Sequence, residues 1–247
     1  MLHELDLSLA EPIADVLARA RSVIATAEPF DPKTSTRRFT IGGPDGGLAW
    51  LVPPLLSALR EEAPSIDLGI RQVLPQAGRI LETSWHPVLE QIEARLMDIA
   101  VLPIREVPAR FASRVLYDET FVVAMRSGHP FKRKPILDRY CEAQHLVVSE
   151  RGDPHGFVDE ALAALGRKRR VALTVPNFMQ ALSVLAETDL IAALPRSLVR
   201  VQSGRFGLVH VEPPLRLPDF QLRAVLPKVA LMDGGLAWLF ERLGRLL

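Results

Sequence analysis

Apolar and polar residues follow two different rhythms along this chain, and the rhythm changes repeatedly after residue 38. Short apolar runs rich in β-branched residues indicate strands, and longer stretches with apolar residues three and four positions apart indicate helices. Strands are predicted at 39–41, 68–74, 98–102, 121–125, 145–149, 171–175, 189–194, 208–211 and 221–226. This alternation is typical of an α/β fold with mainly parallel strands.

Five stripes of apolar residues predict helices between these strands, at about 48–59, 88–96, 157–165, 178–185 and 236–246. Asn177 stands before the fourth stripe and Gln180 follows it three residues later, which predicts a capped helix start. Pro53 and Pro54 fall inside the first stripe. A helix tolerates them only in its first turn or at a kink.

A further amphipathic stripe, from about residue 8 to residue 27, precedes the alternating region. It is followed by the breaker-rich sequence AEPFDPKTSTRR and has no obvious domain of its own to pack on. We expect its apolar side to meet another chain or a separate domain.

Composition narrows the class of protein. The 247 residues, 48% of them hydrophobic, suffice for one large domain or two small lobes. Thirty basic and 29 acidic residues lack the basic excess of a nucleic-acid-binding face. The single cysteine, Cys141, excludes an internal disulfide. With neither a signal-peptide pattern nor a membrane-length apolar run, we expect a cytoplasmic protein without membrane contact.

The sequence GGPDGG, at 42–47, joins a predicted strand to a predicted helix. It is not a dinucleotide fingerprint, because Pro44 stands where the second glycine is needed, and the chain has no GxxxxGK[ST] motif. A glycine turn before a helix leaves backbone N–H groups free for an anion or carbonyl of a ligand. A tight turn that merely requires glycine remains the alternative.

Catalytic and metal-binding patterns are absent from the sequence. The six histidines show no HExxH spacing, and there is no GxSxG motif. We therefore predict no catalytic residue, no metal and no cofactor. The basic run GRKRR, at 166–170, is interpreted as a solvated charge cluster at a helix end rather than a nucleic-acid patch.

The loops that follow the predicted strands are more informative, because ligands of open α/β sheets bind beyond the carboxyl ends of the strands. This rule selects residues 43–47, 103–106, 150–156 and 176–178. Their polar groups are Asp45, Arg105, Ser149, Arg151, His155 and Asn177. Local roles remain open for some of them, since Asn177 fits a helix cap and Ser149 a turn.

The order of segments resembles the effector-binding domain of LysR-type transcriptional regulators, which has the fold of type 2 periplasmic binding proteins. The resemblance is carried by RFTIG, LVPPLLSALREEAPSIDLGI, ARLMDIAVLP, LYDETFVVAMRSGHPF and DLIAALPRSLV, in this order. It covers about four-fifths of the 247 residues. Residues 145–199 look most like the branch that contains nodulation regulators and regulators of aromatic degradation.

The resemblance implies two Rossmann-like lobes joined by two crossover strands, with one lobe at 38–112 plus 213–247 and the other at 113–212. Residues 1–36 would be a linker helix and connector for dimerisation. The implied effector site between the lobes consists of Asp45, Gly46, Gly47, Leu102, Pro103, Ser149, Arg151, Gly152, His155, Asn177 and Phe178.

One position departs from the family. Where relatives commonly have serine or threonine, this chain has Asp45, which would repel the carboxylate of an acidic effector. Either the effector carries a donor or a cation, or Asp45 caps its own helix. We expect an effector with an aromatic or apolar body that contacts Trp50, Leu102 and Phe178, with Arg151 and backbone donors at its polar end.

The resemblance also implies a homodimer or homotetramer, and DNA contact only through a winged helix-turn-helix domain that is absent from this chain. The first alternative is a solute-binding protein of a transporter, which shares the fold. The second is an α/β enzyme that uses Asp45, Arg151 and His155.

Overall fold

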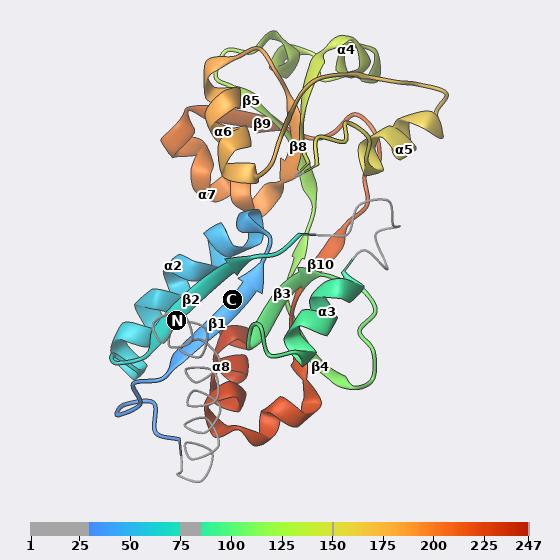
Figure 1. Cartoon of the computed structure of the whole chain (residues 1–247). Helices are drawn as coiled ribbons and strands as arrows, with labels where there is room; N and C mark the ends of the chain where they lie inside the picture. Colours follow the sequence, from blue (N-terminus) through green and yellow to red (C-terminus); the bar gives the residue numbers. More distant parts are fainter. Residues whose placement is uncertain (1–29, 75–84, 150, 247) are drawn as a thin grey trace, which may run out of the picture.

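The computed structural model describes residues 30–74, 85–149 and 151–246, and their strands form three sheets in two lobes (Figure 1). Lobe I is built on a five-stranded sheet with the order β2-β1-β3-β10-β4. Lobe II is built on a three-stranded sheet, β8-β5-β9, and a two-stranded sheet, β6-β7. The predicted linker helix at about 8–27 lies outside the described residues.

The strands of lobe I are buried on both faces where the sheet is central. Its strands are β1 (Arg38–Gly43), β2 (Asp67–Gln72), β3 (Ile99–Pro103), β4 (Phe111–Glu119) and β10 (Phe220–Pro227), and its helices are α2 (Asp45–Glu62), α3 (His86–Glu93) and α8 (Gly234–Gly244), with the 3-10 turn η2 (Lys228–Met232). In β3, Ile99 and Val101 pack with α2 and α8, while Ala100 and Leu102 pack with α3. Alternating side chains of one strand thus belong to two helical layers.

Lobe II contains the shorter sheets and the remaining helices. Its strands are β5 (Phe121–Arg126), β6 (Gln144–Val148), β7 (Arg170–Val175), β8 (Ala192–Pro195) and β9 (Leu208–Val211), and its helices are α4 (Leu137–Glu142), α5 (Phe157–Ala163), α6 (Phe178–Glu187) and α7 (Arg196–Phe206), with the 3-10 turn η1 (Pro130–Arg133). A single parallel bridge between His145 and Ile191 connects its two sheets. Leu182, Leu185 and Leu198, from α6 and α7, pack with buried residues of both sheets.

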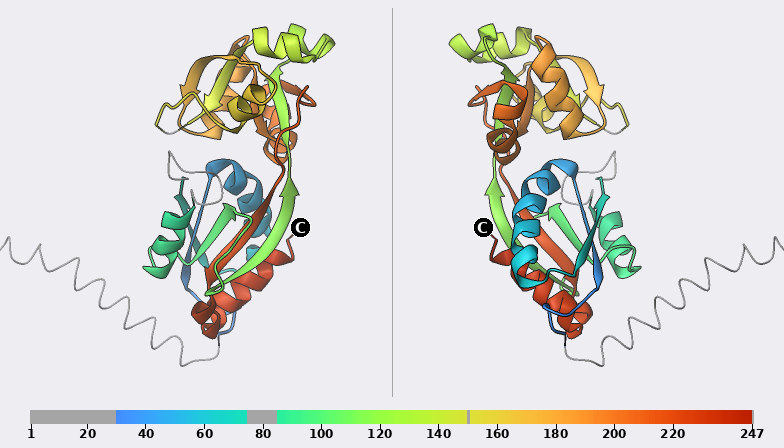
Figure 2. Two further views of the ribbon diagram at one scale, coloured as in Figure 1. Left: turned by 90° about the vertical axis from the view of Figure 1, so that its right-hand side faces the viewer. Right: turned by 90° about the vertical axis from the view of Figure 1, so that its left-hand side faces the viewer.

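Two connections join the lobes, which lie one above the other with the strands β4 and β10 rising between them (Figure 2). Chain from β4 enters β5 through Thr120, and chain from β9 returns to β10. At this junction the ring of Phe121 packs on those of Phe157 and Phe220, with centroids 4.4 and 5.3 Å apart. Two lobes joined by two crossover strands are the architecture that the sequence predicted.

Buried Glu119 fastens the crossover to lobe II. Its carboxylate accepts hydrogen bonds from Thr120 N at 3.0 Å, from Ser197 N at 3.3 Å and from Ser197 Oγ. Because Ser197 lies in the first turn of α7, these bonds tie the end of β4 to the start of α7.

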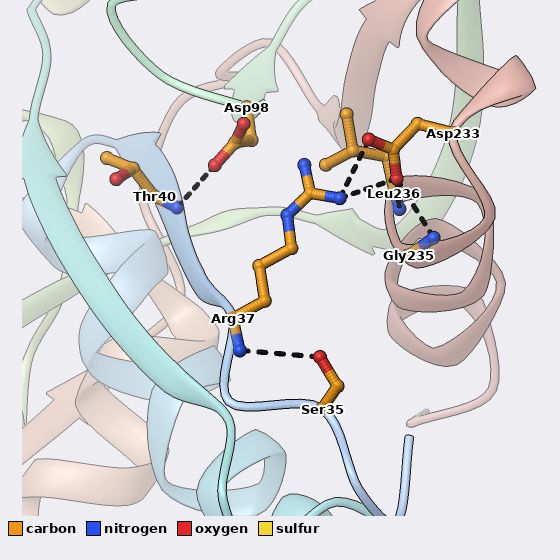
Figure 3. A network of polar contacts seen from close by, with 7 residues as sticks. All are labelled: Ser35, Arg37, Thr40, Asp98, Asp233, Gly235 and Leu236. Carbon is orange, nitrogen blue, oxygen red and sulfur yellow. Dashed lines mark hydrogen bonds and ion pairs between the residues drawn. The ribbon is translucent and has the colours of Figure 1, made fainter. Parts of the chain in front are cut away.

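A polar network holds the beginning of the described chain against lobe I (Figure 3). The Arg37 guanidinium donates to both carboxylate oxygens of Asp233, at 2.6 and 2.7 Å, and Asp233 accepts N–H groups from the first turn of α8. Asp98 accepts from Thr40 N at 2.7 Å, and burial raises the pKa of the Asp98 carboxyl above its usual value. The connector and β1 are therefore anchored to the base of lobe I.

The predicted strands correspond to strands of the structure, but their direction was predicted incorrectly. Three of the strand pairings among the described residues are parallel and four are antiparallel. The expectation of mainly parallel strands is wrong because β10 runs antiparallel to both β3 and β4 in lobe I, and β5 runs antiparallel to both β8 and β9 in lobe II. The predicted limits of the two lobes stay a prediction. The predicted boundary between residues 112 and 113 falls inside β4, and β4 pairs with β10 in the lobe I sheet as far as Glu119.

Several elements escaped the sequence analysis. Strand β4 alternates buried and exposed residues with many polar side chains, while α4 and α7 lack a long apolar stripe. Pro53 and Pro54 lie in the middle of α2 on its exposed side, not in its first turn. Within the described ranges, no helix combines the length and apolar character needed to cross a bilayer.

Candidate functional site

The starts of two helices from different lobes meet at the centre of the molecule. Helix α2 begins at Asp45, directly after β1, and α6 begins at Phe178, shortly after β7. The Oδ2 atom of Asp45 accepts hydrogen bonds from Phe178 N at 2.8 Å and from Met179 N at 3.1 Å. A carboxylate of lobe I therefore caps a helix of lobe II.

The glycines of the loop allow this close approach. A Cβ atom at Gly46 would lie 2.9 Å from Cδ2 of Phe178, and one at Gly47 would lie 3.1 Å from Cδ2 of Leu222. Ala49, one turn further along α2, packs against the interior of lobe II. The glycines that suggested a ligand loop thus bring protein against protein.

The first three N–H groups of α6 all have partners. Asp45 accepts those of Phe178 and Met179, and Oδ1 of Asn177 accepts that of Gln180 at 2.8 Å. The predicted cap by Asn177 is confirmed. In this arrangement the start of α6 has no free donor among these three for an anionic ligand.

The environment of Asp45 disfavours its charge. Burial raises the pKa of its carboxyl above the usual 3.8, and the hydrogen bonds from Met179 and Phe178 oppose this effect without cancelling it. The two readings considered for Asp45 were a contact with the effector and a cap on its own helix. The second is wrong about the helix, because the helix that Asp45 caps belongs to the opposite lobe.

Beside Asp45 lies a groove of about 360 Å³ between α2 and β2. Its lining residues are Asp45, Leu48, Ala49, Val52, Ile70 and Gln72. Ile70 is 47% exposed although it belongs to a strand. The groove is open to solvent and mainly apolar, and its volume lies near the lower end of the range for small-molecule sites.

The other predicted site residues are placed differently. Leu102 is fully buried between the sheet and α3, so, contrary to expectation, its side chain offers no surface to a ligand. Trp50 packs on Tyr117, with ring centroids 4.3 Å apart. Pro103 ends β3 and is partly exposed, and Asn177 is the α6 cap.

The loop after β6 is mostly exposed. Ser149 N donates to the carbonyl of Val175 at 2.7 Å, and Gly152 has a φ of +75°. Arg151 and His155 are exposed, and none of the contacts among the described residues joins either of them to Asp45. Their contribution to a ligand site stays a prediction.

Sequence reasoning missed the groove, and a usable signal for part of it existed. Gln72 stands near the carboxyl end of the predicted strand 68–74, which is the region that the strand-end rule selects, whereas Ile70 lies in the middle of that strand. The contribution of α2 to the same groove depends on how the helix packs beside β2, which no pattern along the sequence predicts.

The basic run 166–170 also differs from its interpretation. Arg169 forms an ion pair with Asp159, with N–O distances of 2.7 and 2.9 Å, and its side chain is only 3% exposed. Nearby, Nε2 of His145 lies 2.7 Å from the carbonyl of Tyr140, and burial lowers the pKa of His145 to about 4. The interpretation of the run as a solvated charge cluster is wrong for Arg169, because Asp159 of α5 lies against the Arg169 side chain and pairs with it.

Comparison with known proteins agrees with this architecture. Residues 33–247 match the LysR substrate binding domain family. The transcriptional activator NagR of a Ralstonia species is 32% identical over 234 residues, which are 94% of this chain and 74% of NagR. Nodulation protein D 3 of Mesorhizobium japonicum is 25% identical, with 94% and 74% covered, so the predicted likeness to nodulation regulators is confirmed.

Solved structures give the same result. The regulatory domain of MexT, a transcriptional activator in Pseudomonas aeruginosa, superposes with a TM-score of 0.72 at 31% identity and covers 87% of this chain and 100% of that one. A probable transcriptional regulator of the same organism gives 0.79 at 25% identity, with 96% and 76% covered. These matches favour a regulator over the transport and enzyme alternatives. The chain belongs to the LysR family and is the effector-binding domain of a transcriptional regulator.

Proposed function

We propose that this domain binds a small effector between its lobes, beside Asp45. The observation that supports this most directly is the groove of about 360 Å³, which is lined by α2 and β2 of lobe I and lies next to the contact between α2 and α6. A ligand seated there touches α2, a helix of lobe I that packs on both α6 and α7 of lobe II. Its binding would therefore depend on how the lobes are arranged.

The lining indicates the chemistry of the effector. Leu48, Val52 and Ile70 present an apolar surface that suits an aromatic or other apolar body. The carboxylate of Asp45 is an acceptor and repels another carboxylate. We expect a polar end that carries a donor, such as a phenol, amide or amine.

We assign the remaining predicted residues to the same site, with Gly46 and Gly47 at the start of α2, Pro103 at the end of β3 and the others on the lobe II side. They are Gly46, Gly47, Pro103, Ser149, Arg151, Gly152, His155, Asn177 and Phe178. An effector acts on the regulator only if it binds one arrangement of the lobes more tightly than the other. We propose that the lobes reach both arrangements by moving about the two crossover connections.

In the cell, we propose that the domain works in a cytoplasmic homodimer or homotetramer that reaches DNA through a winged helix-turn-helix domain. The support comes from relatives named HTH-type transcriptional activators, such as NagR and NahR. Light scattering of the purified chain tests the association, which a single monomeric species would contradict.

Thermal-shift measurements with matched aromatic phenols, amides and acids test the effector site. A ligand at a hundredfold excess over its Kd stabilises a domain by about 2.7 kcal/mol, which raises Tm by several degrees at this size. The matched control is Ile70→Lys, which places a charge in the groove at an already exposed position. Stabilisation by no compound, or undiminished stabilisation of the control variant, would contradict the proposed site.

A further inference from the structure

The hydrogen bonds from α6 to Asp45 are a direct polar contact between the lobes. The acceptor belongs to the first residue of α2, and the donors are the first two N–H groups of α6. Aligned peptide dipoles at a helix start favour a negative oxygen in this position. We propose that Asp45 is a latch: the lobes stay together at α2 and α6 while its carboxylate accepts these two N–H groups, and separate there when it lets go.

Helix α6 carries two caps of different origin. Asn177 belongs to lobe II and accepts the N–H of Gln180, whereas Asp45 belongs to lobe I and accepts those of Phe178 and Met179. Loss of the first disturbs only the helix. Loss of the second disturbs the helix and also removes a connection between lobes, so the two caps form a matched pair for experiment.

The packing around the latch is small and closely fitted. Gly46 faces the ring of Phe178, since a Cβ atom there would lie 2.9 Å from Cδ2 and 3.1 Å from Cγ. Ala49 continues this face of α2 toward the interior of lobe II. Glycine and alanine contribute little apolar area on the α2 side, so the apolar surface buried at this point comes mainly from the Phe178 ring. The hydrogen bonds of Asp45 consequently matter for holding the contact closed.

The charge of Asp45 works against a permanent contact. Its carboxylate loses hydration when the latch closes, and burial raises the pKa of this carboxyl. The hydrogen bonds and the lost hydration therefore oppose each other. An opposition of this kind is what allows a contact to switch between two arrangements.

Two measurements on the full chain test the latch. Amide hydrogen exchange reports on the N–H groups of Phe178, Met179 and Gln180 individually. The interlobe distance is measured between nitroxide labels at the exposed positions Glu61→Cys and Lys168→Cys, in a Cys141→Ser background. The variants are Asp45→Ala, which removes the acceptor, Asp45→Asn, which keeps an acceptor oxygen, and Asn177→Ala as the matched control.

In Asp45→Ala we expect exchange at Phe178 and Met179 to become about tenfold faster or more, and the label distance to lengthen and broaden. Asp45→Asn should stay within about threefold of the wild type at both amides. Asn177→Ala should accelerate exchange at Gln180 and leave the distance unchanged. Gly46→Ala, whose added Cβ pushes Phe178 away while the carboxylate remains, should lengthen the distance by an independent route.

Two results would overturn the proposal. One is an unchanged distance in Asp45→Ala and Gly46→Ala with normal protection of Phe178 and Met179. The other is lobe separation in Asn177→Ala as large as in Asp45→Ala, which would assign the effect to the stability of α6. Should Asp45→Ala fail to fold, Gly46→Ala and Asp45→Asn decide the question. Because no effector is added, a failed effector screen and a failed latch remain distinguishable.

Discussion

The starts of α8 and α6 use the same chemistry in two different settings. Asp233 accepts N–H groups of Gly235 and Leu236, at 2.9 and 3.0 Å, and Asp45 accepts two N–H groups of α6. Asp233 stands immediately before its own helix and is paired with Arg37 (Figure 3). Asp45 reaches the helix of another lobe, and no ion pair joins it to a basic side chain of the described ranges.

The comparison shows how one interaction can make either an anchor or a latch. A half-buried carboxylate whose charge is compensated by a guanidinium is costly to remove, because the remaining partner is then left unpaired. A buried carboxylate that accepts only N–H groups has no opposite charge beside it, so less of the free-energy cost of losing its hydration is compensated. The first setting holds the connector to lobe I, and the second suits the contact between lobes that we propose to open.

The largest effect is expected at the anchor. Asp233→Ala should lower the free energy of unfolding by about 3 kcal/mol, because it removes two cap bonds and leaves Arg37 partly buried without its partner. Urea denaturation measures this. Asp233→Asn keeps the cap oxygen and should lose less. An equally small loss in both variants would show that Asp233 is no anchor.

His145 limits the pH range in which anchor and latch can be compared. Its pKa is lowered from 6.5 to about 4 by burial, so the unfolded chain takes up a proton between these values while the folded chain does not. Stability should therefore fall by up to roughly 3 kcal/mol as the pH drops from 6.5 to 4. His145→Gln should remove this part of the acid sensitivity in denaturation series, and an unchanged acid limb would contradict the assignment.

A smaller loss is expected at the latch. Asp45→Ala should lower the free energy of unfolding by about 1 kcal/mol, as for loss of a single helix cap, because each lobe keeps its own core. Urea denaturation beside Asp233→Ala tests the difference. A loss at Asp45 that equals or exceeds the loss at Asp233 would remove the distinction between anchor and latch.

The smallest effect is the pH dependence of Asp45 itself. Its raised folded pKa means that the stability linked to its proton is fully present below pH 3.8 and is lost as the pH rises through the folded pKa. The wild type should therefore be most stable relative to Asp45→Asn at low pH. As the pH rises to neutrality, the wild type should lose less than about 1 kcal/mol of this relative stability. Subtracting the two pH series cancels His145. A difference that grows with pH would reverse the sign and contradict the raised pKa.

Most strands and helices could be predicted from local patterns, because each produces its own periodicity of apolar residues along the sequence. Predicted strands such as 208–211 and 121–125 agree with β9 and β5 within a residue, and the Asn177 cap was predicted from two residues. Strand β4 escaped because its polar alternation is weak evidence of a strand without its neighbour β10. The sequence analysis did not predict the antiparallel pairings, because strand direction depends on which strands become neighbours in the folded lobes.

The candidate site was only partly readable. The strand-end rule selected Asp45, Asn177 and the loop before Phe178, which the structure brings together. It also selected positions near Leu102, whose side chain the packing of α3 removes from the surface. A rule about loop ends locates the region of a site, whereas the packing of helices decides which side chains reach it.

By itself the sequence determined most of the strands and helices, the two-lobe class and the unusual carboxylate at the start of α2, but not β4, α4 or α7. Only the tertiary structure decided that this carboxylate is used between lobes, since Asp45 and Phe178 lie 133 positions apart along the chain. A helix start offers unpaired N–H groups wherever it lies, and the nearest acceptor in space takes them. Sequence fixes which groups need partners, and the packing of the lobes fixes which partners they find.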